Sequence, residues 1–139
     1  MTADPVVATL VVDLANVMGS RPDGWWRDRA GAAARLLAAL APLAGRSVAG
    51  PADGPVVLRE IVAIVEGRAR DADVPPGASG LTVVLAPADG DTTVAEVAAA
   101  RAAAGEQVLV VTADRGLRAR LPEAAQVVGP GWVNALIGR

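Results

Sequence analysis

The sequence predicts an α/β protein with a mostly parallel sheet of about five strands. Two observations support this fold class. Short apolar runs rich in β-branched residues alternate with segments whose apolar residues recur at helical spacing, which is typical of a parallel sheet with helices on both faces. Several of the runs also end at an acidic residue, which predicts a polar site where strands end.

The first predicted strand covers residues 9–12 and places Asp13 at its carboxyl end. The run Thr-Leu-Val-Val is too short to span a membrane and too β-branched to favour a helix, so a buried central strand fits it best. In open α/β sheets, ligands bind beyond the carboxyl ends of the strands, because helices cover both faces. Asp13 is therefore the first candidate site residue.

Four further strands are predicted from similar runs. The segment 56–66 also fits a helical face, but its β-branched residues run into Glu66 and Gly67, and this favours a strand. The four strands lie at residues 61–65, 81–85, 108–111 and 126–128.

Helices are predicted between the strands, with Pro42 and Gly105 as stop signals. Loops are expected over 17–24, lying above the site, over 45–55, with room for a short irregular strand, and over 68–80. The helices lie at residues 28–41, 91–104, 117–121 and from Pro130 onward, which completes the order β-α-β-β-α-β-α-β-α.

The amino-acid composition excludes several kinds of catalytic and binding site. The chain has no Cys and no His, which excludes disulfides, thiolate or imidazole metal sites and a His general base. A net charge of -2 argues against nucleic-acid binding through a broad basic face, although local basic patches are compatible with it. With three Trp and no Tyr or Phe, stacking of bases on aromatic rings is not expected to be the main mode of recognition.

The remaining expectations concern size and location. A chain of 139 residues fits one domain that can fold without metal or disulfide staples. The first residues lack the pattern of a signal peptide, and no apolar run is long enough to cross a membrane. We therefore expect a soluble cytoplasmic protein with no membrane partner.

Four acids are predicted to gather at one edge of the sheet. Asp13, Glu66 and Asp114 follow strands, and Asp91 opens a helix. Converging carboxylates repel one another unless a divalent cation lies among them, and oxygen ligands without His suit Mg²⁺ or Mn²⁺. We expect the carboxylates of Asp13, Asp91 and Asp114 to be close enough to share one ion. Such a site would support metal-assisted hydrolysis of a phosphodiester.

Most of these acids also have a structural interpretation. Asp91 and Asp114 both stand where a helix N-cap is wanted, and Asp89 is interpreted as a loop acid. Glu66 is as well explained by a solvated strand end as by a metal site. Asn16 either closes an Asx-type turn or orients the Asp13 carboxylate and a metal-bound water.

The motifs resemble a known family. Leu-Val-Val-Asp-Leu-Ala-Asn-Val is similar to the D-x-x-N motif of NYN domains, the branch of PIN-like nucleases that includes YacP-type proteins, and Val-Val-Thr-Ala-Asp-Arg-Gly-Leu is similar to their V-T-x-D-x-x-L motif. The resemblance spans nearly the whole chain. It implies one PIN-like domain over 1–139, a three-layer α/β/α sandwich, and a Mg²⁺- or Mn²⁺-dependent ribonuclease. Asp13, Asp91 and Asp114 would be metal ligands, together with Glu66, and Asn16 an orienting residue.

The chain departs from the family pattern in two respects. The further acid that often follows the second motif has only Glu123 to represent it, which leaves open one metal or two, or an inactive relative. The basic surface is also thin, and the residues expected to contact substrate are Arg21, Arg115 and Arg118.

Three functions therefore remain open. The first is a metal-dependent nuclease acting on single-stranded RNA. The second is a nucleotide pyrophosphohydrolase, which the absence of a Gly-rich phosphate loop disfavours. The third is a non-catalytic nucleotide-binding, RNA-binding or regulatory domain of the same fold, with a homodimer through Trp25, Trp26 and the Ala-rich helix as one form of it.

Overall fold

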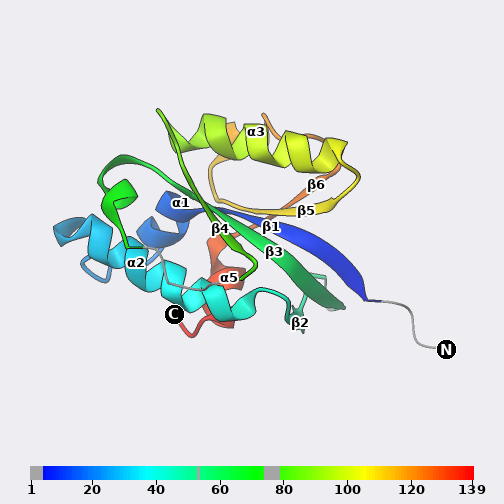
Figure 1. Cartoon of the computed structure of the whole chain (residues 1–139), viewed down its shortest axis with the longest axis horizontal. Helices are drawn as coiled ribbons and strands as arrows, with labels where there is room; N and C mark the ends of the chain where they lie inside the picture. The colour runs from blue at the N-terminus through cyan, green and yellow to red at the C-terminus, as the bar shows by residue number, and fades with distance from the viewer. Residues whose placement is uncertain (1–4, 53, 74–78) are drawn as a thin grey trace.

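The protein has a mixed α/β structure in which helices cover both faces of a six-stranded, mostly parallel sheet (Figure 1). The computed structural model describes residues 5–52, 54–73 and 79–139. The strands are β1 (Val6–Asp13), β2 (Ser47–Ala49), β3 (Pro55–Val65), β4 (Leu81–Leu85), β5 (Gln107–Val111) and β6 (Ala125–Val128).

Five α-helices and three 3₁₀ helices connect these strands within the described residues. The α-helices are α1 (Leu14–Gly19), α2 (Arg29–Leu40), α3 (Gly90–Ala103), α4 (Arg115–Arg118) and α5 (Pro130–Leu136). The 3₁₀ helices are η1 (Trp25–Arg27), η2 (Ala41–Leu43) and η3 (Gly67–Asp71). None of the helices in these parts of the chain is long and apolar enough to span a membrane.

The strand order makes β1 the centre of the sheet. β1 pairs in parallel with β3 on one side and with β5 on the other, and β6 lies beyond β5. The far side of β3 pairs with β2, antiparallel, along its first residues and with β4, parallel, along its last. The five parallel strands therefore end at one edge of the sheet.

The chain changes direction across the sheet at β1. It first builds outward from β1 through β3 to β4, and α3 then returns it over the opposite face to β5 and β6. α1, α2 and α5 lie on one face, and α3 lies on the other (Figure 1). The reversal falls between β1 and β5, and open α/β sheets bind their ligands beyond the strand ends at such a point.

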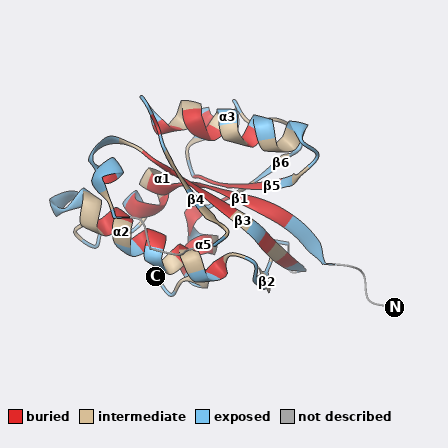
Figure 2. Ribbon diagram, viewed as in Figure 1, coloured by how far each residue is buried: buried red, intermediate tan, exposed pale blue. Residues whose placement is uncertain are grey.

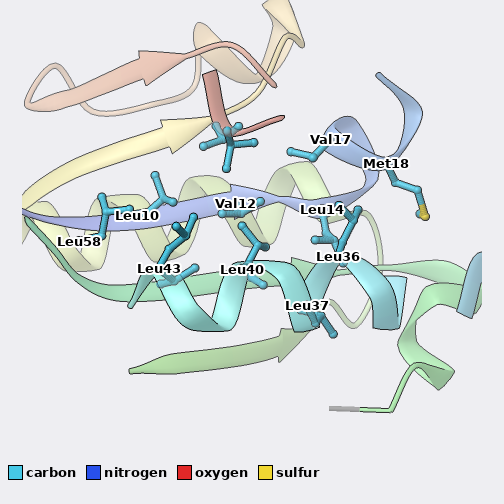
Figure 3. Packing of buried hydrophobic residues seen from close by; sticks show 14 of the residues in the cluster. Leu10, Val12, Leu14, Val17, Met18, Leu36, Leu37, Leu40, Leu43 and Leu58 are labelled. Carbon is cyan, nitrogen blue, oxygen red and sulfur yellow. The ribbon is translucent and has the colours of Figure 1, made fainter. Parts of the chain in front are cut away.

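Alternating side chains of each strand form the two layers of the core. In β1, Leu10 and Val12 pack toward the leucines of α2, as Figure 3 shows, while Val11 packs on the α3 side. This alternation follows from the two-residue period of a strand. Figure 2 shows that the central strands are buried through most of their length, while the helices keep an exposed outer side. The buried strand ends thus hold the edge residues in place.

Two predicted boundaries are wrong in an informative way. The expected loop over 17–24 begins with the last residues of α1, because Leu14, Val17 and Met18 are buried at helical spacing. β3 is much longer than 61–65, because its first half pairs with β1 from Val6 onward through one irregularity in register.

The other boundaries shift slightly. The short strand expected within 45–55 is β2, and part of the expected 68–80 loop forms η3, while 74–78 of that loop lie outside the described residues. α3 begins one residue earlier than predicted, and α4 covers 115–118 in place of 117–121.

Candidate active site

Asp13 is a buried carboxylate at the end of the central strand. Its side chain is 3% exposed, and its Oδ2 accepts a hydrogen bond from the Thr112 hydroxyl at 3.2 Å. Burial raises the pKa of Asp13 to about 6, against the hydrogen bonds from Thr112 and the Asn16 backbone, and the charges of Asp91 and Glu66 raise it further. Across the described residues, no Arg forms an ion pair with this carboxylate. The fold thus keeps a carboxylate that prefers a cation beside it.

Thr112 connects the ends of β1 and β5. Its hydroxyl donates to Asp13 and accepts a hydrogen bond from the backbone N–H of Asp114 at 3.1 Å. Thr112 is 1% exposed, so both bonds are shielded from water. This role was not predicted, although the position of Thr112 in the V-T-x-D motif is a signal that could have found it.

Asn16 makes a second link between the end of β1 and the segment after β5. Its Oδ1 accepts a hydrogen bond from the backbone N–H of Ala113 at 2.9 Å, which joins α1 to the segment that follows β5. Of the two predicted roles, a local Asx-type turn does not describe this contact, because the partner is far away in the sequence. Asn16 instead positions the end of β5 against the helix that begins after Asp13.

Glu66 lies against the start of α3. Its Oε2 accepts a hydrogen bond from the backbone N–H of Gly90 at 2.5 Å. A Cβ atom on Gly90 would lie 3.0 Å from the carboxyl carbon of Glu66, so glycine allows this close approach. The negative charge of Glu66 is favourable at a helix N-terminus. The end of β3 and the start of α3 are thereby tied together.

Of the acids at the helix starts, Asp114 caps its helix as expected, whereas Asp89 and Asp91 differ from expectation. Asp89, expected to be a loop acid, is the N-cap of α3, since its Oδ1 accepts from the backbone N–H of Thr92 at 2.8 Å. Asp91 lies in the first turn and does not cap it. Asp114 does cap α4 and accepts from the N–H of Leu117 at 3.0 Å.

Asp91 therefore has no capping role to explain it. It is half-buried, and burial raises its pKa, followed by the charges of Asp114 and Glu66. Asp91 also contributes to the raised pKa of Asp13. The four acids thus lie near enough to one another to interact electrostatically at one edge of the sheet.

The same acids do not form a preformed metal-binding site. Among the residues that the structure describes, no three acidic side chains stand close enough together to hold an ion between them. This corrects the expectation that Asp13, Asp91 and Asp114 already share coordinating distance. The donor set still fits a hard cation, because Mg²⁺ commonly keeps several waters and contacts only one or two carboxylates directly.

The predicted substrate arginines lie on the surface around this edge. Arg115 and Arg118 are exposed in α4, directly after Asp114, and Arg21 is exposed beyond the end of α1. Arg120 was not predicted. Its guanidinium donates to the hydroxyl of Thr92 at 3.1 Å, and its charge lowers the pKa of Asp91 against the larger effects that raise it.

Comparison with known proteins supports the fold. No protein-family model matches the chain, and no curated protein matches it by sequence. The structure is similar to the crystal structure of Rae1 (YacP) from Bacillus subtilis, in its W164L mutant form, with a TM-score of 0.68 and 14% identity. The match covers 94% of this chain and 75% of that chain. At this identity the likeness concerns the fold alone.

Proposed function

We propose that this protein is a PIN-like, NYN-type ribonuclease that hydrolyses phosphodiester bonds of RNA with the help of Mg²⁺ or Mn²⁺. The observation that carries the proposal is the buried Asp13 carboxylate, which lies at the end of β1, next to the end of β5 and near three other acids. A structure keeps such an unfavourable arrangement where it serves a function, since perturbed carboxylates cluster at active sites. The likeness to a YacP structure supports the same class.

The other acids of the sheet provide a contrast. Nearer the amino ends of the strands, Glu60 and Glu106 are paired with Arg101, at 2.8 and 3.3 Å, and Glu106 is also paired with Arg59. In the described chain, Asp13 and Asp91 have no such ion pair. This contrast supports the proposal that the acids at the other end of the sheet bind an external cation.

Each residue of the site has a role in this proposal. Asp13, Asp91 and Asp114 would hold the cation through one or two direct carboxylate contacts and otherwise through its water ligands, with Glu66 beside them at the start of α3. Thr112 orients Asp13 through its hydroxyl, and Asn16 keeps the end of β5 in place. When bound, Mg²⁺ or Mn²⁺ lowers the pKa of a water ligand and stabilises the charge that builds on the leaving oxygen.

The chain's own groups limit the mechanism further. It contains no His, Cys, Lys or Tyr, so a thiol or amine nucleophile and an imidazole base are not available. The carboxylates can accept a proton from water, and the exposed Arg115 and Arg118 beside Asp114 can contact phosphate oxygens. A hydrolysis in which acids, arginines and a bound divalent cation take part matches this composition.

The decisive test offers the purified protein a labelled single-stranded RNA and, separately, nucleoside triphosphates. RNA cleavage should require Mg²⁺ or Mn²⁺, stop with a chelator, and proceed poorly with Zn²⁺, whose preferred N and S ligands are absent. Asp13→Asn should lower the rate by orders of magnitude. Glu96→Gln is the matched control, because Glu96 is an exposed acid on α3.

Two outcomes would contradict the proposal. Metal-dependent hydrolysis of triphosphates without cleavage of RNA would identify a pyrophosphohydrolase. No metal-dependent turnover of either substrate would leave a non-catalytic binding domain.

A further inference from the structure

We infer that the cleft between η1 and η3 binds a single-stranded segment of RNA and leads it to the acids of the candidate active site; the choice of RNA rests on the proposed function. The cleft has a volume of about 620 Å³, and its walls come from Trp26, Arg27 and Arg29 on one side and from Gly67 and Arg68 on the other. It was not predicted from the sequence, because its two walls are about forty residues apart.

The cleft continues toward the acids. A second hollow of about 260 Å³ shares Arg29, Gly67 and Arg68 with the first and extends to Glu66 and Trp25. The two hollows therefore adjoin, and η3 follows directly after Glu66. A chain lying in the cleft would reach the edge of the sheet at the end of β3.

The charges of the cleft favour a polyanion. Arg27, Arg29 and Arg68 are exposed, and none of them forms an ion pair with a carboxylate of the described residues. Asp28 and Asp71 also line the cleft, but the Asp28 carboxylate caps α2 by accepting from the N–H of Gly31 at 2.9 Å. Three guanidinium groups against two carboxylates leave a local positive charge in a protein whose net charge is -2.

The aromatic residues of the cleft favour bases. Trp25 and Trp26 meet edge to face, with ring centroids 5.8 Å apart. Trp25 is half-buried and packs on the core, whereas Trp26 is 49% exposed. The guanidinium of Arg29 lies 5.4 Å from the Trp25 ring, and that of Arg27 lies 5.9 Å from the Trp26 ring. Trp25 thus supports the exposed ring of Trp26, and each of the two rings has a guanidinium group beside it.

Together these features match single-stranded nucleic acid. Proteins that bind single strands combine a positive groove for the phosphates with aromatic rings on which bases stack. The few aromatic residues of this chain suggested that stacking would be minor, but two of the three Trp line the cleft and its adjoining hollow, together with three Arg. A duplex cannot use this arrangement well, because its bases are already stacked and paired.

The test measures binding without cleavage. The full-length protein is titrated in chelator with a labelled single-stranded RNA, and anisotropy is followed over a series of salt concentrations. Trp26→Ala should weaken binding roughly 5- to 150-fold, the range for one stacked base, and Trp26→Phe should restore most of it. Arg68→Ala should weaken binding and reduce the salt slope by about 0.7. Arg35→Ala is the control, because Arg35 is exposed on α2 outside the cleft.

Circular dichroism and melting curves establish that each variant is folded. The inference is overturned if folded Trp26→Ala and Arg68→Ala bind RNA as the wild type does, or if a duplex of the same sequence binds as tightly as the single strand. It is also overturned if the wild type binds no RNA but self-associates in a way that Trp26→Ala abolishes, since the cleft would then be a protein interface.

The inference and the proposed function can fail separately. Cleft-dependent RNA binding without metal-dependent hydrolysis would support the cleft and reject the ribonuclease. Metal-dependent hydrolysis with a KM that Trp26→Ala leaves unchanged would support the ribonuclease and reject the cleft.

Discussion

Asp13 combines two properties that both disfavour its ionised form in the metal-free protein. It is almost fully buried, and its neighbours Asp91 and Glu66 are acids. The pKa of Asp13 is therefore raised to about 6 from 3.8, so the folded state holds a proton that the unfolded state has already released. In contrast to a typical paired carboxylate, ionisation of Asp13 destabilises the fold.

This gives a prediction with a defined sign. Between pH 3.8 and about 6 the folded state binds more protons at Asp13, so this residue makes stability fall as the pH rises through that window. The free energy of unfolding lost across this window is on the order of 3 kcal/mol, because each pKa unit corresponds to about 1.4 kcal/mol. In chelator, Asp13→Asn should gain stability relative to the wild type at neutral pH and gain little near pH 4.

Urea unfolding of the wild type and of Asp13→Asn at both pH values measures this difference. Because groups remote from Asp13 titrate equally in both proteins, the comparison isolates Asp13 together with its coupling to Asp91 and Glu66. A stability difference that does not change with pH would show that the carboxylate is not destabilised by burial.

At the scale of elements, Asp114 at the start of α4 has two roles that can be tested separately, one as a helix cap and one as a proposed metal ligand. Asp114 caps α4 through its Oδ1, and the same residue contributes to the raised pKa of Asp91. Capping and metal binding make different demands on the side chain, because Asn caps about as well as Asp but lacks a charge.

We expect Asp114→Asn to keep the melting temperature of the metal-free protein close to that of the wild type. Asp114→Ala should lose about 1 kcal/mol of stability, the usual contribution of an N-cap. Both variants should bind Mn²⁺ more weakly if Asp114 is a ligand. Thermal melts combined with Mn²⁺ titration measure the two effects, and unchanged Mn²⁺ affinity in both variants would leave Asp114 with the cap alone.

A second element-scale feature joins the end of α3 to the sheet. Arg101 donates to both carboxylate oxygens of Glu60 at 2.8 Å, and it also reaches Glu106. Hydrogen bonds from Arg101 lower the pKa of Glu60, and Thr82 of β4 donates to the same carboxylate at 3.0 Å. A lowered pKa means that this stability is present at neutral pH and is lost as the pH falls through the folded-state pKa.

Glu60→Gln should therefore destabilise the protein by about 1 kcal/mol at neutral pH, because it removes one charged partner from a partly exposed pair. The difference between variant and wild type should shrink on acidification, which is opposite in sign to the effect of Asp13. Chemical unfolding at two pH values measures it. A difference that grows as the pH falls would contradict this account of the pair.

At the scale of the whole molecule, cation binding and folding should be coupled. The acids come from β1, β3, α3 and the end of β5, so the unfolded chain does not bring them together. A cation that binds only the folded state stabilises it by about 2.7 kcal/mol at one hundred times its dissociation constant.

Mn²⁺ should accordingly raise the melting temperature of the wild type by several degrees in a concentration-dependent way. It should have little effect on Asp13→Asn, which removes the buried ligand, while Glu96→Gln should respond as the wild type does. Scanning calorimetry over a range of Mn²⁺ concentrations measures this shift. An equal shift in Asp13→Asn would place the cation elsewhere.

The sequence by itself determined the features that depend on neighbouring residues. The β-branched run before Asp13 specifies a buried strand, and the structure has that strand as β1. The helical spacing of Leu36, Leu37 and Leu40 likewise predicts α2, whose limits differ from the prediction by about one residue. The parallel sheet and the position of the acids at strand ends follow from these local patterns.

Only the tertiary structure decided what depends on contacts between distant segments. Thr112 meets Asp13 across 99 positions of sequence, and Glu66 meets Gly90 across 24. Neither the true N-cap of α3 nor the cleft beside Trp26 can be derived from spacing along the chain. Local propensity acts over a few residues, whereas these contacts form only when burial of the central strand fixes the order of its neighbours.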